Sequence, residues 1–149
     1  NSTSWPSLYQ LHLLSETAFA LGLDISNVKS INLDYMDVEN VVGMFNGGPV
    51  VGDGGSHPWA GAFDRETGTM YLFAESFAPA SNLNIPLATD STGMGMIDSV
   101  SVDYTAMENL IHSFGHETAH SLGLDTKSVW HVQGERMGMD AVERFRGMY

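Results

Sequence analysis

The sequence predicts one α+β domain that covers residues 1–149. Three observations lead to this fold class: short alternating segments in the first half, a strongly periodic helix after residue 104, and a second amphipathic helix at the C-terminus. The hydrophobic content of 43% in 149 residues is enough for one core. No repeat or linker divides the chain. We expect a small twisted mixed sheet combined with an N-terminal, a central and a C-terminal helix.

The N-terminal half predicts one helix and one strand before a glycine-rich segment. Leucines and Phe19 recur at a near-helical period over residues 7–21, and Gly22 is placed to end that helix. Residues 28–36 alternate apolar and polar side chains, which is typical of a half-buried strand. Residues 43–61 contain seven glycines and predict a long surface loop.

The middle of the chain predicts a hairpin followed by a loop. Residues 59–77 hold two strand-like segments on either side of the turn-rich stretch 64–68. Residues 79–95 are polar, with Pro86 and two glycines, and we expect a loop there.

Two helices are predicted in the last third of the chain. Apolar residues fall at three- and four-residue steps from Tyr104 to Leu122, with Asp103 as the N-cap and Gly123 as the C-terminal stop. Residues 133–149 predict the C-terminal helix. Gly134 and Gly138 weaken this helix by about 1 kcal/mol each if they are interior.

Composition excludes several classes of function. The net charge of −12, from 18 acidic and six basic residues, argues against nucleic-acid binding, which needs a basic surface. Solubility explains this charge most simply, and the alternative is an electrostatic preference for a basic substrate or partner, such as a cognate inhibitor. The absence of cysteine excludes disulfides, thiolate ligands and a cysteine nucleophile. No segment has the roughly 20 apolar residues that a membrane span needs, so we expect a soluble protein.

The central helix carries the sequence His116-Glu117-Thr118-Ala119-His120. Two histidines four residues apart project from one helix face, so both rings can reach one cation at about 2.0–2.1 Å, as tetrahedral zinc requires. Glu117 lies about 100° around the helix, where it can act as general base on a metal-activated water and then as general acid. His112 continues the same stripe one turn earlier, and a packing or supporting role is expected for it.

The stretch from Phe114 to Leu124 resembles the active-site helix of zincin metallopeptidases, and it is especially similar to that of the metzincins. This resemblance implies a zincin-like domain whose upstream hairpin provides an edge strand for an extended substrate. The chain departs from the metzincin pattern at Thr126, where that branch has a third histidine. Glu135, with Gly138 three residues later, is similar to the ligand glutamate of the gluzincin branch.

The third zinc ligand is therefore sought in the C-terminal part of the chain. We favour Glu135, to complete a set with His116 and His120. Four other residues remain open as alternatives to Glu135: Asp125, His131, Asp140 and Glu143.

The resemblance implies a zinc-dependent endopeptidase that cleaves a protein or peptide, with Glu117 as general base and acid. The alternatives are a zinc amidase of cell-wall peptides and a degenerate zincin that serves as a binding module, for which Thr126 speaks. The compact, acidic and cysteine-free chain is also similar to toxin or effector domains that bacteria deliver into other cells. That similarity implies a secreted or delivered protein with a proteinaceous inhibitor or immunity protein as partner, and no nucleic-acid or membrane partner is expected.

Overall fold

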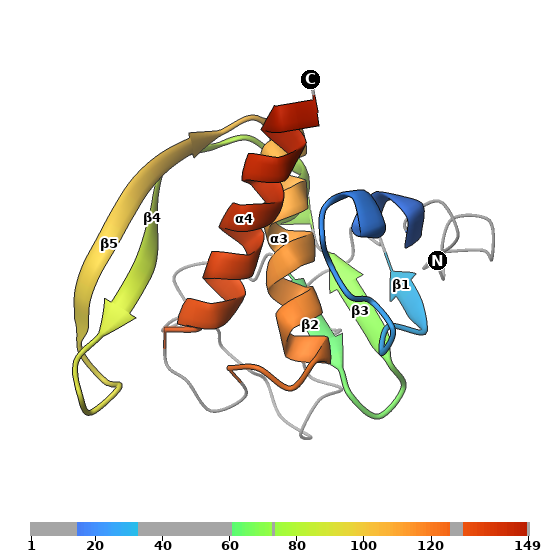
Figure 1. Ribbon diagram of the computed structural model, residues 1–149, viewed down its shortest axis with the longest axis horizontal. Helices are drawn as coiled ribbons and strands as arrows, with labels where there is room; N and C mark the ends of the chain where they lie inside the picture. The colour runs from blue at the N-terminus through green and yellow to red at the C-terminus, as the bar shows by residue number, and fades with distance from the viewer. Residues whose placement is uncertain (1–14, 33–60, 73, 126–129, 149) are drawn as a thin grey trace.

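The chain has the predicted α+β fold, arranged around a central helix (Figure 1). A computed structural model describes four parts of the chain, residues 15–32, 61–72, 74–125 and 130–148. Helix α3 (Ala106–Ser121) packs against a small sheet on one side and against α4 (Val132–Met148) on another. Residues on nearly every side of α3 are buried, as expected of a helix in the middle of the core.

The sheet next to α3 is mixed, as predicted, with strand order β1-β3-β2. Strand β1 (Ser30–Asn32) runs parallel to β3 (Thr69–Leu72), while β2 (Gly61–Asp64) pairs with β3 in an antiparallel hairpin. The hairpin predicted over residues 59–77 is thus confirmed in its described part, and a 3-10 turn (Ala74–Phe77) follows it. Among the described strands, β1 and β2 are the two edge strands of this sheet, and β2 contacts α3.

The N-terminal helix is confirmed where the structure describes it. Residues 15–20 are helical, and Gly22 has a left-handed φ of 75°, as the predicted stop requires. Of the predicted strand 28–36, residues 30–32 form β1. The glycine-rich segment before residue 61, with His57, lies outside the described residues, as does Thr126.

The loop predicted over residues 79–95 is wrong, because β4 (Ala80–Thr89) and β5 (Met96–Tyr104) form a two-stranded antiparallel ribbon there. The ribbon runs beside α4 (Figure 1), which β4 contacts. Its inner side chains join the core, whereas much of its outer side is polar and gives the segment the composition of a loop. A two-stranded ribbon leaves each strand one edge without ladder bonds, so Pro86 is tolerated in β4.

The predicted start of the central helix is also corrected. Tyr104 ends β5, and the N-cap is Thr105 instead of Asp103. The Thr105 side chain accepts a hydrogen bond from the Glu108 backbone N–H, and the Glu108 carboxylate accepts one from the Thr105 N–H. This capping box determines where the helix begins, because it satisfies two N–H groups that have no partner within the helix.

Two glycines allow α3 and α4 to pack very closely. A Cβ atom on Gly115 would lie 2.8 Å from the Gly138 Cα, and a Cβ on Gly138 would lie 2.5 Å from the His112 carbonyl oxygen. The predicted C-terminal helix is confirmed as α4. Its glycines weaken it as an isolated helix, but they leave the space in which α3 packs. Among the described residues no helix is long and apolar enough to cross a membrane.

Candidate metal centre

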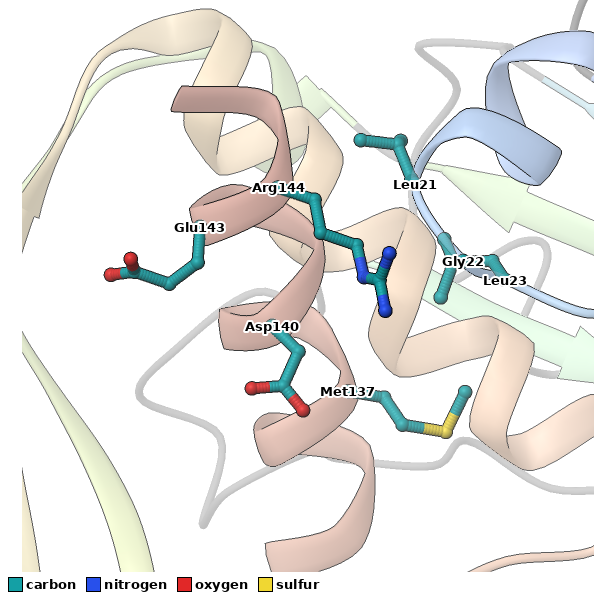
Figure 2. Close-up of a pocket in the computed structure, with 7 residues that line it drawn as sticks. All are labelled: Leu21, Gly22, Leu23, Met137, Asp140, Glu143 and Arg144. Carbon is teal, nitrogen blue, oxygen red and sulfur yellow. The ribbon is translucent and has the colours of Figure 1, made fainter. Parts of the chain in front are cut away.

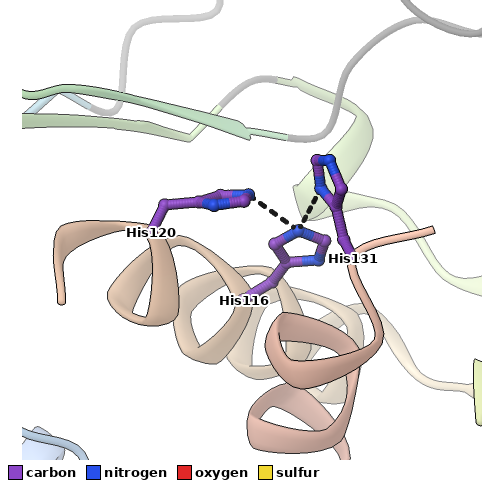
Figure 3. Close-up of side chains that lie close together, drawn as sticks. All are labelled: His116, His120 and His131. Carbon is purple, nitrogen blue, oxygen red and sulfur yellow. Dashed lines mark hydrogen bonds between the residues drawn. The ribbon is translucent and has the colours of Figure 1, made fainter. Parts of the chain in front are cut away.

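Three histidine side chains converge where the end of α3 meets the start of α4 (Figure 3). His116 and His120 project from α3, and His131 is the residue before α4. The His116 Nε2 atom lies 3.1 Å from His120 Nε2 and 3.2 Å from His131 Nδ1. The predicted pair of histidines therefore faces one point, and His131 supplies the donor atom that joins them there.

The orientation of His120 follows from how α3 ends. Gly123 has a φ of 83°, its N–H bonds to the His120 carbonyl, and the Leu124 N–H bonds to the Ala119 carbonyl. This pattern is a Schellman motif, which turns the chain back over the last helical turn. The turn brings the Leu124 carbonyl to 3.1 Å from His120 Nδ1. Because a carbonyl only accepts, Nδ1 carries the proton and Nε2 of the neutral ring has a free lone pair.

The orientation of His116 is set by Glu135. The His116 Nδ1 atom lies 2.8 Å from Glu135 Oε1, and Gly134 leaves room for the imidazole, since a Cβ there would lie 2.9 Å from its Cδ2. Burial acts to raise the pKa of Glu135, but hydrogen bonds from His112 and His116 outweigh burial and hold this pKa well below its usual range. Glu135 is thus an ionised acceptor to which His116 Nδ1 donates, and Nε2 of the neutral His116 ring has a free lone pair.

When the His116 ring is neutral, two lone pairs therefore face each other across the 3.1 Å between His116 Nε2 and His120 Nε2. Either a proton on His116 Nε2, which makes this contact a hydrogen bond, or a metal ion held by both rings removes the repulsion between them. Donors about 2.0–2.1 Å from a tetrahedral ion are about 3.3–3.4 Å apart, close to the two distances that meet at His116 Nε2 (Figure 3). The arrangement of the three histidines suits a metal ion.

The electrostatic environment keeps His120 available as a metal ligand at neutral pH. Burial, followed by the charges of His116 and His131, lowers the pKa of His120 to about 4. His120 is therefore neutral at pH 7 and able to bind a metal through Nε2. For His116, burial acts to lower the pKa, but Glu135 and the charge of Glu117 raise it overall. A proton is thus the natural competitor of a metal ion at this position.

Glu117 lies on the side of α3 that faces β2. Gly61 allows this contact, because a Cβ at that position would be 2.8 Å from the Glu117 Cγ and 3.1 Å from its Oε2. The Glu117 Oε1 atom is buried and has no hydrogen-bond partner among the described residues. Burial raises the pKa of Glu117 to about 7, although the charge of His116 opposes this shift. A carboxyl group with such a pKa can both accept and donate a proton near neutrality.

The other proposed ligands lie in different surroundings. Asp125 accepts a hydrogen bond from the Gly134 N–H and so caps the start of α4. Asp140 and Glu143 lie more than two turns further along α4, where they line a pocket of about 410 Å³ with Leu21, Gly22, Leu23, Met137 and Arg144 (Figure 2).

Glu135, the ligand favoured by the sequence, belongs to a second group with His112 and His116 that could also hold a metal ion. Its Oε1 atom is 2.8 Å from both His112 Nε2 and His116 Nδ1. These are ordinary distances for N–H donors bonded to a carboxylate and are shorter than the separation of ligands around tetrahedral zinc. The two distances therefore indicate hydrogen bonds, and not metal coordination, in this second group.

Of two contacts at the site, the one made by the Leu124 carbonyl is predictable from the sequence and the one between Gly61 and Glu117 is not. The Gly123 pattern predicts the end of the helix, and the position of the Leu124 carbonyl follows from it. The contact between Gly61 and Glu117 joins residues 56 positions apart, and the local sequence contains no signal for it.

His131 and Asp125 have φ values of 52° and 58°. These values are uncommon outside glycine, and such strained backbone is found at functional sites.

Comparison with protein-family models, curated proteins and solved structures found no match to this chain. Within the described residues, the chain thus has a cluster of histidines with one glutamate that could hold a metal ion.

Proposed function

We propose that this protein is a zinc-dependent peptidase in which His116, His120 and His131 hold the ion and Glu117 transfers the proton. The observation that carries the proposal is the convergence of three histidine nitrogens, with His116 Nε2 3.1 Å from His120 Nε2 and 3.2 Å from His131 Nδ1. His131 is one of the alternatives that the sequence left open. We take it in place of Glu135 because its Nδ1 atom lies beside His116 Nε2, whereas Glu135 lies beside Nδ1 on the other side of the ring.

The donor set supports zinc. Three imidazoles with one open position are typical of catalytic zinc sites, and each of two rings donates its other N–H to an acceptor, as metal-bound histidines do. A zinc ion in such a site supplies a Lewis acid and lowers the pKa of water toward neutrality. The hydrogen bonds to Glu135 and to the Leu124 carbonyl orient the rings of His116 and His120, which would hold the ion.

The surroundings of Glu117 support hydrolysis of an extended chain. Its buried Oε1 has no partner among the described residues, so this oxygen is free to accept a proton. Its other oxygen lies against Gly61 at the start of β2, which is one of the two edge strands of the described sheet. An edge strand can bind a peptide by main-chain hydrogen bonds, and this one would bring the peptide close to Glu117. Delivery to other cells and a proteinaceous inhibitor stay predictions from the sequence.

The experiment combines metal content with cleavage of a mixed fluorogenic peptide library. We expect about one zinc per chain, and Glu117→Gln should retain the zinc but lose cleavage by about 10²–10⁴-fold, as loss of a general base does. Glu108→Gln, on the same helix, is the matched control and should retain both. Unchanged cleavage by Glu117→Gln would contradict the proposal.

Two further results would favour the alternatives. A zinc-loaded chain that cleaves only cell-wall peptides is an amidase. One that cleaves neither these nor the library is a binding module. A wild-type chain without zinc would refute both the peptidase and the amidase and would favour the binding module.

A further inference from the structure

Glu135 is shared by two histidines. Its Oε1 atom accepts from His116 Nδ1 and also from His112 Nε2, each at 2.8 Å. The His112 side chain is only 6% exposed, and that of Glu135 is 18% exposed. A buried carboxylate that lost one of these donors would lose a charge-assisted hydrogen bond in a place where water replaces it poorly.

His112 is held in place from several sides. The Tyr104 hydroxyl lies 3.4 Å from His112 Nδ1, a long and therefore weak hydrogen bond. Gly138 packs closely against the ring, because a Cβ there would be 2.9 Å from His112 Nδ1. Since Glu135 only accepts, His112 Nε2 carries the proton, and Nδ1 of the neutral ring accepts from Tyr104. Donors and acceptors are thus consistent from Tyr104 through His112 and Glu135 to His116.

Glu135 also lies one helical turn after His131, and its backbone N–H bonds to the His131 carbonyl. A carboxylate one turn from a ligand is close enough to compete for the ion. A ligating carboxylate would fill the position that must stay open for catalysis. The two hydrogen bonds to Oε1 direct Glu135 instead to the far side of the His116 ring.

We infer that His112 is a positioning residue of the metal centre: it donates to Glu135 and thereby holds that carboxylate on His116 Nδ1 and out of the coordination sphere. The inference rests on the proposed zinc site and goes beyond it, because it assigns a role to a histidine that does not face the ion. His112 acts through Glu135, so its removal weakens the orientation of a ligand without removing one.

The test compares two polar substitutions of similar size. His112→Gln places an amide N–H near the position of Nε2 and can still donate to Glu135, whereas the amide of His112→Asn corresponds to Nδ1 and does not reach that carboxylate. Zinc affinity is measured by competition with a chromophoric chelator, and the coordination number by the visible spectrum of the Co²⁺-loaded chain. Thermal unfolding of each metal-free variant reports on folding separately.

We expect His112→Asn to bind zinc about 10–100-fold more weakly, the usual effect of losing such a supporting group, and to show the weaker absorption of Co²⁺ with more than four ligands. His112→Gln should bind close to wild type. Glu108→Gln is the control, because its ion pair with Arg146 also joins α3 to α4 but does not contact the histidines. It should leave the zinc affinity unchanged.

Equal zinc affinity for His112→Asn and wild type overturns the inference. So does an equal decrease for His112→Asn and His112→Gln, which would indicate packing alone. Both outcomes leave the proposed function intact, provided that the wild-type chain binds zinc. A wild-type chain that binds no zinc overturns the proposed function and this inference together.

Discussion

The contact between α3 and α4 predicts a large effect of one methyl group at Gly138. A Cβ on that residue would lie 2.5 Å from the His112 carbonyl oxygen, where ordinary van der Waals contact begins near 3.4 Å. The oxygen belongs to the backbone of α3, so the helices must separate by several tenths of an ångström or more. Overpacking of this kind costs about 1–3 kcal/mol. At about 2–4 °C per kcal/mol for a chain of this size, Gly138→Ala should lower the Tm by about 2–12 °C.

The matched control for Gly138→Ala is Gly147→Ala, on the same helix. A Cβ on Gly147 would meet nothing within 4 Å, so alanine should raise the stability there by up to about 1 kcal/mol through its helix propensity. Both variants are measured by thermal and urea unfolding of the metal-free chain. The same chemical change is thus expected to have opposite signs at two positions of α4. A Gly138→Ala chain as stable as wild type would refute the close packing of the two helices.

Three further outcomes are expected. His131→Ala should weaken zinc binding on the order of 100-fold or more, since structural zinc sites with four protein ligands bind with about 10–16 kcal/mol, or about 2.5–4 kcal/mol per ligand. Isothermal titration calorimetry with zinc measures this affinity, and unchanged binding would exclude His131 as a ligand. Gly61→Ala should keep the zinc but lower peptide cleavage by about 10²-fold, because the new methyl group displaces Glu117. Full cleavage of the fluorogenic peptides by this variant would contradict the contact between Gly61 and Glu117. The hydrogen bond from Arg146 lowers the pKa of Glu108, so this pair stabilises the fold above the ordinary glutamate pKa of 4.5 and ceases to do so as the pH falls through the lowered pKa. Glu108→Gln should therefore lower the free energy of unfolding by about 0.2–1 kcal/mol at pH 7, and the difference from wild type in urea unfolding should shrink at acid pH. A difference that does not change with pH would show that the pair contributes nothing.

Helix boundaries were predictable where a local signal exists. Gly22 and Gly123 both adopt the left-handed φ that ends a helix, as the sequence predicts. The start of α3 was predicted two residues too early, because both Asp103 and Thr105 are residue types that cap helices. Glu108 decides between them, since it lies at the third helical position after Thr105 and completes a capping box.

The β4–β5 ribbon was not predicted, although part of its pattern is visible in the sequence. Val100, Val102 and Tyr104 alternate with polar residues, and all three contribute to the core or pack against it. The helical periodicity that includes Tyr104 obscured this alternation. Pro86 and the glycines near the ribbon turn made the segment similar to a loop. Strand pairing is a tertiary property, and β4 is recognisable as a strand mainly through its ladder with β5.

The sequence by itself determined the pair of histidines and the acid beside them. His116, Glu117 and His120 lie within five residues of one helix, and helix geometry alone settles which of their side chains share a face. Only the tertiary structure decided which side chain of the C-terminal part lies beside these two histidines. His131 and Glu135 are one turn apart at the start of α4, and nothing local distinguishes them as ligands. The docking of α4 on α3 brings His131 to the Nε2 side of His116 and Glu135 to its Nδ1 side.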